Sequence, residues 1–290
     1  MSLWGRNILA YSAFHTFAGL SNKPDKNFMA MFIGFMDGDG YFDIGEQKQY
    51  NRNKTPARST IRIRLACNLN VRDLTLLEYF VKILGVGKID YSMMAKKEQV
   101  RVIFSKKDLL TVIIPIIKKY DLMFLTSQRA KQFAQVNYIL DNSIIHWDAF
   151  NFKEPVFGYF AAKSVQDLVK LDYYANWIVG FTMAEGSFGF KADGSAFYQL
   201  KQSGSDNVNL LKAASLRITG EESNKLWNPD SKGAYQLSLS SIKDVEQVIL
   251  FFSSPDHHPL YSYKLDQYLN FTSNLNKSKR YSSMTAKIFK

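Results

Sequence analysis

A segment near the start of the chain recurs in the same pattern further along, and this internal repeat constrains the fold more than any other feature. The segment NFMAMFIGFMDGDGYFDI, residues 27–44, matches YYANWIVGFTMAEGSFGF, residues 173–190, at an offset of 146. The offset aligns Gly34 with Gly180, Phe35 with Phe181, Asp39 with Glu185, Gly40 with Gly186, and Phe42 with Phe188. Residues 100–117 and 235–252 match as well, each reading as an alternating strand followed by an amphipathic helix. A repeat of this length predicts two similar halves related by a pseudo-twofold axis.

The order of elements within each half indicates the fold class. Each half reads as a helix, a β-hairpin, a helix, further strands and closing helices, an αββαββα-type pattern. The hairpins are expected at residues 41–67 and 187–202. The predicted class is therefore α+β, with antiparallel or mixed sheets. The expected segments are an N-terminal half over residues 1–140 with an arm over residues 1–23, a surface-packed linker over residues 141–170, and a C-terminal half over residues 171–290 with a basic tail.

The helices predicted within the two repeated segments have almost no polar face. Seven of the nine residues from Phe28 to Met36 are large and apolar, which is typical of a helix buried on most sides. Gly34 and Gly38 lie four residues apart, as do Gly180 and Ala184. Small residues at this spacing let two helix backbones approach closely. We therefore expect the two motif helices to pack against each other at the pseudo-twofold axis.

An acidic residue ends each motif helix. Asp39 and Glu185 lie at helix C-termini, where the helix dipole disfavours negative charge, and the twofold axis would bring the two carboxylates together. Divalent cations would remove both penalties, and oxygen ligands from few protein groups favour Mg²⁺. An exposed DGDG turn is the alternative. A calcium EF-hand loop is excluded because Phe42 stands where its glycine is needed, and a dinucleotide fingerprint because the glycines follow a helix rather than a strand.

The charge balance points to a polyanionic partner. The chain has 37 Lys and Arg against 26 Asp and Glu, a net charge of +11, and this excess favours nucleic acid over a membrane surface. An ordinary basic enzyme is the alternative. The single cysteine excludes a disulfide framework and a cysteine-rich zinc site, and the four histidines lack metal-ligand spacing. No stretch is long and apolar enough to suggest a membrane span.

Basic residues concentrate on one predicted hairpin face. Residues 47–72 hold seven basic residues and no acidic residue. Within this range, Arg62 and Arg64 alternate with apolar residues along one strand. A ribbon of this kind fits the DNA major groove, whereas a solvated basic face is the alternative. The candidate DNA contacts are Asp43, Gln47, Lys48, Arg52, Lys54, Arg58, Arg62 and Arg64 in the first half, and Gly189, Lys191, Gln199 and Lys201 in the second. The tail over residues 276–290 carries five more basic residues and is expected to contact phosphates or to fray.

The two repeated segments resemble a known motif. FIGFMDGDG at residues 32–40 and IVGFTMAEG at residues 178–186 resemble the LAGLIDADG motif, so the chain resembles a single-chain, two-motif LAGLIDADG homing endonuclease of the fungal organelle intron type over residues 25–275. The resemblance implies saddle-shaped sheets on a long DNA site. It also implies Mg²⁺ held by Asp39 and Glu185 with the carbonyls of Gly38 and Ala184, and cleavage of both strands to leave 5′-phosphates and short 3′ overhangs.

The resemblance also implies a basic residue near each catalytic acid. In the second half, HPLYSYKLDQY presents Lys264 after a Pro-Leu pair, whereas the first half offers Gln128 and then Arg129 at the comparable place. We take Asp39, Glu185, Lys264 and Gln128 as the candidate catalytic residues. Met183 replaces the first motif acid of the second copy, so its counterpart Asp37 is not expected to bind the metal directly. Unequal sites predict that one strand is cut faster.

The implied biology is that of a monomer acting on double-stranded DNA. Mg²⁺ is the expected cofactor, with Mn²⁺ or Ca²⁺ able to substitute in binding, and a mitochondrial location follows from the resemblance alone. No membrane partner is expected. An intron RNA maturase, or a DNA-binding protein without catalysis, is the alternative on the same fold; loss of a motif acid would favour it, and both acids are present.

Overall fold

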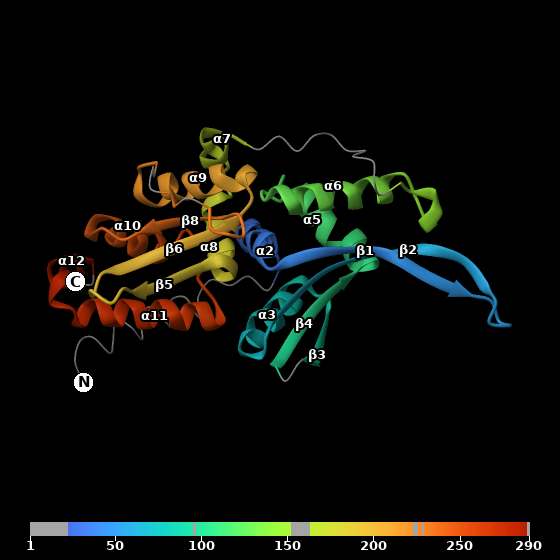
Figure 1. The fold of residues 1–290 in the computed structure, drawn as a ribbon, viewed down its shortest axis with the longest axis horizontal. Helices are drawn as coiled ribbons and strands as arrows, with labels where there is room; N and C mark the ends of the chain where they lie inside the picture. Colours follow the sequence, from blue (N-terminus) through green and yellow to red (C-terminus); the bar gives the residue numbers. More distant parts are fainter. Residues whose placement is uncertain (1–22, 95–96, 152–162, 223–225, 228, 289–290) are drawn as a thin grey trace. The chain divides into compact units, whose positions relative to one another are not determined.

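A computed structural model describes residues 23–94, 97–151, 163–222, 226–227 and 229–288, and its elements follow the same order in both repeats (Figure 1). The first repeat contains α2 (Lys26–Gly38), β1 (Gly40–Tyr50), β2 (Pro56–Asn70), α3 (Leu74–Leu84), β3 (Lys88–Met94), β4 (Lys97–Ser105), a continuous helix made of α4 (Lys106–Asp108), the π turn η2 (Leu109–Ile113) and α5 (Ile114–Lys119), and α6 (Ser127–Asp141). The second contains α8 (Tyr174–Glu185), β5 (Gly186–Phe190), β6 (Ala196–Ser203), α9 (Val208–Thr219), β7 (Leu226–Trp227), β8 (Ala234–Leu239), α10 (Ile242–Phe252) and α11 (Ser262–Lys277).

Short elements connect and close the two repeats. They are the 3-10 turns η1 (Val71–Asp73), η3 (Trp147–Ala149), η4 (Ser205–Asn207) and η5 (Lys279–Tyr281), and the helices α7 (Val165–Lys170) and α12 (Ser282–Ile288). Part of the predicted linker is therefore structured, while residues 152–162 and the predicted arm up to residue 22 lie outside the described residues. No helix in the described ranges is long and apolar enough to cross a membrane.

Each repeat builds one antiparallel sheet with the same topology, which confirms the α+β class. The strand orders are β1-β2-β4-β3 and β5-β6-β8-β7. Phe42, Ile61, Ile63 and Leu65 are buried on one face of the first sheet, whereas Arg62 and Arg64 between them are only half-buried. The predicted alternation is confirmed, because successive side chains on a strand point to opposite faces.

Helices cover the apolar face of each sheet. Phe188 on β5 packs within 5.6 Å, between ring centroids, of Phe252 on α10 and of Tyr268 and Phe271 on α11. Matching capping boxes start the helices that follow β4 and β8, formed by Ser105 with Asp108 and by Ser241 with Asp244. In each box the serine accepts from the backbone of the acid, and the acid accepts from the backbone of the serine, so two otherwise unpaired N–H groups are satisfied.

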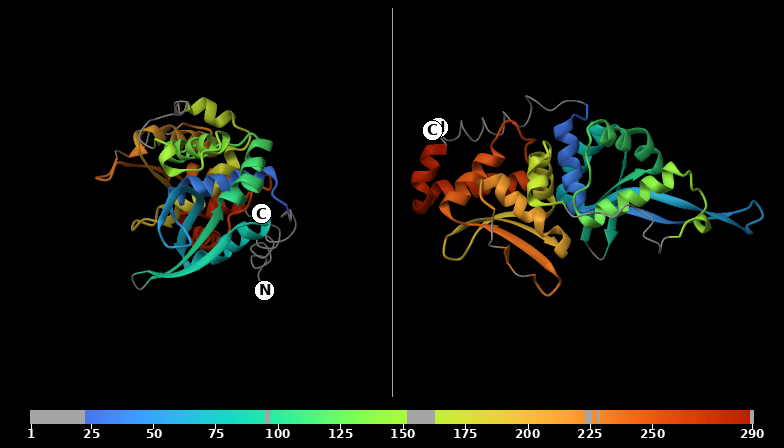
Figure 2. Two further views of the ribbon diagram at one scale, coloured as in Figure 1. Left: turned by 90° about the vertical axis from the view of Figure 1, so that its right-hand side faces the viewer. Right: turned by 90° about the horizontal axis from the view of Figure 1, so that it is seen from above.

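By their contacts, the elements divide into two compact units, and the division does not follow the repeat. Met1–Gly38 and Lys163–Lys290 form one unit, and Asp39–Ala162 form the other. The first motif helix, α2, therefore belongs with the second repeat, because it packs along α8 (Figures 1 and 2). The chain passes from one unit to the other at the peptide bond between Gly38 and Asp39.

Candidate active site and nucleic-acid interface

The two motif helices pack backbone against backbone, as the small-residue spacing predicts. A Cβ atom on Gly34 would lie 2.1 Å from the Trp177 carbonyl oxygen, and one on Gly180 would lie 1.8 Å from the Met31 carbonyl oxygen. Any side chain at either position would overlap the opposing backbone. Every residue from Phe28 to Asp37 is buried, so α2 has no solvent-facing side over this span. The helices are thus held at a distance that only glycine allows.

This close packing continues to the ends of the two helices, where the predicted catalytic acids lie. A Cβ on Gly38 would lie 2.4 Å from the Cβ of Ala184 and 3.7 Å from Oε1 of Glu185. The Glu185 carboxylate therefore lies beside the last residue of α2. Glu185 is itself the last residue of α8, and Asp39 follows Gly38 directly. The predicted interface residues Gly34, Gly38, Gly180 and Ala184 all lie at this crossing.

The remaining motif acid has a structural partner. Asp37 is 1% exposed, and its Oδ2 accepts a hydrogen bond of 2.7 Å from the Trp177 indole N–H. Trp177 is fully buried and stacks on Tyr174 and Phe181, so the indole is held in place from both sides. Burying a carboxylate is costly unless donors satisfy it, and this indole is one such donor. The geometry agrees with the expectation that Asp37 is not a metal ligand.

In the second repeat, the predicted lysine reaches the residue after the acid. Lys264 lies in the first turn of α11, and its ammonium group donates a hydrogen bond to the Gly186 carbonyl. Gly186 begins β5 immediately after Glu185. The lysine charge is therefore fixed at the junction between the motif helix and the sheet.

In the first repeat, Arg129 rather than Gln128 takes the equivalent position. Helices α6 and α11 both begin with serine, and Arg129 and Lys264 are the third residue of each. Gln128 is exposed at the preceding position, whereas Arg129 is half-buried and its Nη1 donates to Gln132 Oε1 at 2.7 Å. The same Gln132 oxygen accepts from the backbone N–H of Phe42 at 3.4 Å, which ties Arg129 to β1.

Arg129 and Asp39 both influence the buried thiol of Cys67. Cys67 pairs with Gly40 at the start of β1 and is fully buried. Burial raises the pKa of its thiol well above the ordinary value; the negative charges of Asp39 and Asp73 raise the pKa further, and the positive charge of Arg129 lowers it. Asp39 and Arg129 therefore both lie within electrostatic range of the Cys67 thiol. In the sequence, Arg129 lies four residues after the buried Leu125, and Lys264 lies four residues after the buried Leu260. Aligning the two leucines would have matched Arg129 with Lys264.

The predicted basic ribbon forms the polar face of the first sheet. Lys48, Arg52 and Lys54 are exposed around the β1–β2 turn, and Gln47 is exposed on β1. Asp43 lies opposite Arg64 in the register of the two strands but pairs with Arg62, whose Nε and Nη2 lie 3.0 and 3.1 Å from its oxygens. A Cβ on Gly45 would lie 2.7 Å from Arg62 Nη2, so this glycine leaves room for the guanidinium.

Other predicted basic contacts are also paired with acids inside the protein. Arg58 Nη2 lies 2.9 Å from Asp148 Oδ1, and this contact lowers the pKa of the Asp148 carboxyl. Lys201 lies 2.6 Å from Asp230 and lowers the pKa of that carboxyl to about 2. These partly exposed pairs contribute little to stability. Their effect is to orient the basic side chains along the sheets.

The polar face extends beyond the predicted residues. Arg101 on β4 lies opposite Asn68 on β2, and its guanidinium is 5.9 Å from the centre of the Tyr41 ring. Arg64 lines a shallow concavity of about 550 Å³ together with Lys88 on β3. These additions depend on strand pairing between β2, β4 and β3. In the first repeat the sequence prediction covered only the β1–β2 hairpin, so it included Arg64 but not Arg101 or Lys88.

The second sheet has a less charged polar face. Gly189 is half-buried on β5, and Lys191 is exposed in the turn after it. Gln199 is half-buried on β6 and donates to Ser238 on β8 at 3.3 Å, while Lys201 carries the Asp230 pair described above. Hydrogen-bonding amides and hydroxyls therefore predominate here over cations.

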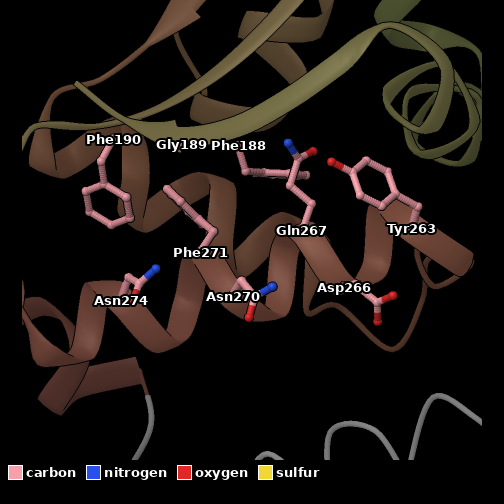
Figure 3. A pocket seen from close by; sticks show the side chains of 9 residues that line it. All are labelled: Phe188, Gly189, Phe190, Tyr263, Asp266, Gln267, Asn270, Phe271 and Asn274. Atoms are coloured by element: carbon pink, nitrogen blue, oxygen red, sulfur yellow. The ribbon is translucent and has the colours of Figure 1, made fainter. Parts of the chain in front are cut away.

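A small pocket lies on the helical side of the second sheet. It has a volume of about 220 Å³ between β5 and α11, where Phe188 and Phe190 face Asn270, Phe271 and Asn274 (Figure 3). Its ionisable lining side chains are Asp266 and Tyr263. No group of three or more His, Cys, Asp or Glu side chains gathers within the described ranges, so any metal held at the motif acids would need water or phosphate ligands.

Comparisons with known proteins agree with this geometry. The family model described as LAGLIDADG endonuclease matches residues 32–140. A structure of I-SmaMI bound to uncleaved DNA target in the presence of calcium ions is 16% identical, with a TM-score of 0.66 over 89% of this chain and 97% of that chain. The I-LtrWI LAGLIDADG homing endonuclease bound to target DNA is 18% identical, with a TM-score of 0.61 over 91% of this chain and 97% of that chain. Residues 32–140 are thus similar to the LAGLIDADG endonuclease family, and the chain shares its fold with the two DNA-bound structures over about nine-tenths of its length.

Proposed function

We propose that this protein is a site-specific double-strand DNA endonuclease that uses Mg²⁺, acts as a monomer and leaves short 3′ overhangs. The observation that carries the proposal is the glycine-only crossing of α2 and α8, which fixes a motif acid at the end of each helix. The structurally similar I-SmaMI and I-LtrWI were solved with DNA, which supports double-stranded DNA as the substrate.

The residues at the helix ends suit a hard divalent cation. Asp39 and Glu185 offer carboxylate oxygens, and Gly38 and Ala184 offer backbone carbonyls, so the donors are all oxygen. The absence of a side chain on Gly38 leaves the Glu185 carboxylate close to the α2 backbone. A bound Mg²⁺ would supply an activated water and stabilise the leaving oxygen.

The two basic residues give the halves different chemistry. Lys264 carries a compact charge on the Gly186 carbonyl, and an ammonium group can exchange a proton with water. Arg129 remains charged in any protein environment, so it can stabilise a phosphate oxygen but cannot transfer a proton. We therefore expect the strand served by the Glu185–Lys264 half to be cut at a different rate from the strand served by the Asp39–Arg129 half.

The first experiment is cleavage of a randomised double-stranded DNA library in Mg²⁺, with both ends of the products sequenced. A long, partly degenerate site with 3′ overhangs would support the endonuclease, and Asp39→Asn and Glu185→Gln should each abolish cutting of one strand. No cleavage in Mg²⁺ or Mn²⁺, together with tight binding of a defined DNA or intron RNA, would support the non-catalytic binder instead.

Once the target is known, the rate at which each variant nicks each DNA strand shows which basic residue serves which strand. Arg129→Ala and Lys264→Ala are each expected to slow one strand by about 10² or more, the usual range for losing a positioned electrostatic group. Gln128→Ala is the matched control one position away. Loss of activity in Gln128→Ala with full activity in Arg129→Ala would return the role to Gln128.

A further inference from the structure

The C-terminal segment after α11 is docked rather than frayed. Tyr281 is fully buried, and its hydroxyl accepts a hydrogen bond of 2.8 Å from the Ala196 N–H at the start of β6. Met284 and Thr285 in α12 are buried as well. Arg280 Nη1 donates to Ser195 Oγ at 3.3 Å, which places the segment against the turn between β5 and β6 (Figure 1).

This docking gathers positive charge at the tip of the second hairpin. Lys277, Lys279 and Arg280 are exposed, and Lys191 is exposed in the adjoining turn. The turn also holds one acid, Asp193, whose Oδ1 accepts from the N–H and the hydroxyl of Ser195 and whose charge interacts with Arg280 and Lys191. From residue 276 to the end of the sequence there is no acidic residue. The tip therefore has an excess of exposed cations.

The second hairpin is shorter than the first, and the docked segment lies beside its turn, at Ser195 and Ala196. β5 has five residues, whereas β1 has eleven. At about 3.3 Å per residue the missing length is about 20 Å, or roughly six base pairs of DNA at about 3.4 Å each. The first hairpin carries Arg52 and Lys54 in its turn, while the tip of the second is flanked by Lys279 and Arg280.

Helix α11 relates this tip to the proposed active site. The helix runs along β5, since Phe271 lies within 5.6 Å of both Phe188 and Phe190 between ring centroids. It carries Lys264 in its first turn and ends at Lys277, just before the docked segment. At about 1.5 Å per residue, Lys277 at the end of the helix lies about 20 Å from Lys264 along the helix axis. That spacing again corresponds to about six base pairs.

We propose that Lys279 and Arg280 bind the DNA backbone at the outer end of the second half-site, where the docked C-terminal segment takes the place of the missing hairpin length. The partner is a pair of phosphate groups, so these contacts add affinity without base preference. The proposal rests on the proposed DNA-binding function and adds to it a surface outside the two sheets.

The test uses the full chain with Lys279→Ala and Arg280→Ala combined. The probe is a fluorescein-labelled 30-base-pair duplex of random sequence, and anisotropy gives the affinity over a range of salt concentrations. Each phosphate contact contributes about 0.9 to the slope of log affinity against log salt, so the double variant should lose between about 1 and 2 from the slope. Circular dichroism checks that the variant is folded.

The chain contains a matched control. Lys118 and Lys119 also precede a tyrosine, and the Lys119 ammonium lies 4.9 Å from the centre of the Tyr120 ring, much as the Arg280 guanidinium lies 5.8 Å from that of Tyr281. Both lysines are exposed at the end of α5, in the helical layer of the first repeat. The variant Lys118→Ala with Lys119→Ala should keep the wild-type slope. A wild-type slope in the Lys279/Arg280 variant overturns the proposal, while a wild-type protein that does not bind the duplex overturns the proposed function as well.

A tethered cleavage reagent then locates the contact on the target. The sole cysteine, Cys67, is buried, so Ser283→Cys carries one accessible thiol for an iron chelate. Cuts about six base pairs outside the cleavage site, on the second half-site only, are expected. Cuts confined to the centre of the target, or none, contradict the placement.

Discussion

Gly180→Ala tests whether the distance between the motif helices is set by their backbones. The added methyl would lie 1.8 Å from the Met31 carbonyl oxygen and 2.8 Å from the Phe35 nitrogen, whereas real Cβ atoms essentially never approach below 3.0 Å. The helices would have to separate by about 1 Å, and a gap of that size forfeits between a quarter and a half of the dispersion energy across the contact. Both partners are backbone atoms, so no side-chain rotation can relieve the overlap.

The expected magnitude follows from two opposing effects. Overpacking a core costs about 1–3 kcal/mol and more where nothing can move, while replacing glycine by alanine within a helix gains about 1 kcal/mol. Because both partners are backbone, we take the upper end of the overpacking cost and expect a net loss of about 2 kcal/mol in the free energy of unfolding, measured by urea denaturation followed by circular dichroism. Gly189→Ala is the control, because its Cβ would meet only the Phe197 ring, at 2.7 Å, and that half-buried ring can turn away. A Gly180→Ala protein within 1 kcal/mol of the wild type would refute the reasoning, since such a small loss requires a looser crossing.

Three further outcomes are expected. Asp37→Ala should destabilise the fold by about 2 kcal/mol, because it leaves the buried Trp177 indole without its carboxylate acceptor, and Asp37→Asn, which keeps an oxygen there, should cost less in the same urea assay. Asp230→Asn should steepen the salt dependence of DNA binding by up to about 0.9, because it releases the Lys201 ammonium for a phosphate; a shallower slope would contradict this. Burial lowers the pKa of His257, so its contribution to stability is full above about pH 6.5 and is lost as the pH falls through the lowered folded value; the loss of unfolding free energy between pH 7 and 5 should shrink in His257→Asn.

The fold could be predicted because its strongest determinants are local and occur twice. Small residues four positions apart predict close helix packing at the same positions in both motifs. The structure has backbone contacts at Gly34 and Gly180. Alternation of Ile61 and Ile63 with arginines predicts which sheet face is apolar, because strand side chains alternate regardless of tertiary context. The helix starts at Ser105 and Ser241 also depend on residues only three positions apart.

The site details that sequence reasoning missed depend on distant partners. Arg58 pairs with Asp148, 90 residues away, and no local pattern indicates that contact. Gln128 was preferred to its neighbour Arg129 because the sequence alone does not show which of the two is the third residue of its helix, the position that Lys264 has in α11. Pro115 lies within the helix expected before residue 117, and the helix accommodates it because the π turn over Leu109–Ile113 precedes it and the proline falls in the first turn of α5. Such a turn relaxes the backbone pattern that a proline otherwise disrupts.

The differences between the two motif helices favour a single chain over a dimer of identical halves. At the repeat offset of 146, Asp37 corresponds to Met183 and Trp177 corresponds to Met31, so only the pairing of α2 with α8 brings the carboxylate to the indole. Two copies of α2 would place each Asp37 against Met31, which has no N–H to donate, and two copies of α8 would leave each Trp177 indole facing Met183. A buried polar group without its partner costs about 1–3 kcal/mol, and each homodimer would contain two of them by symmetry. The glycines allow close packing for all three pairings, and the Asp37–Trp177 hydrogen bond selects one of them.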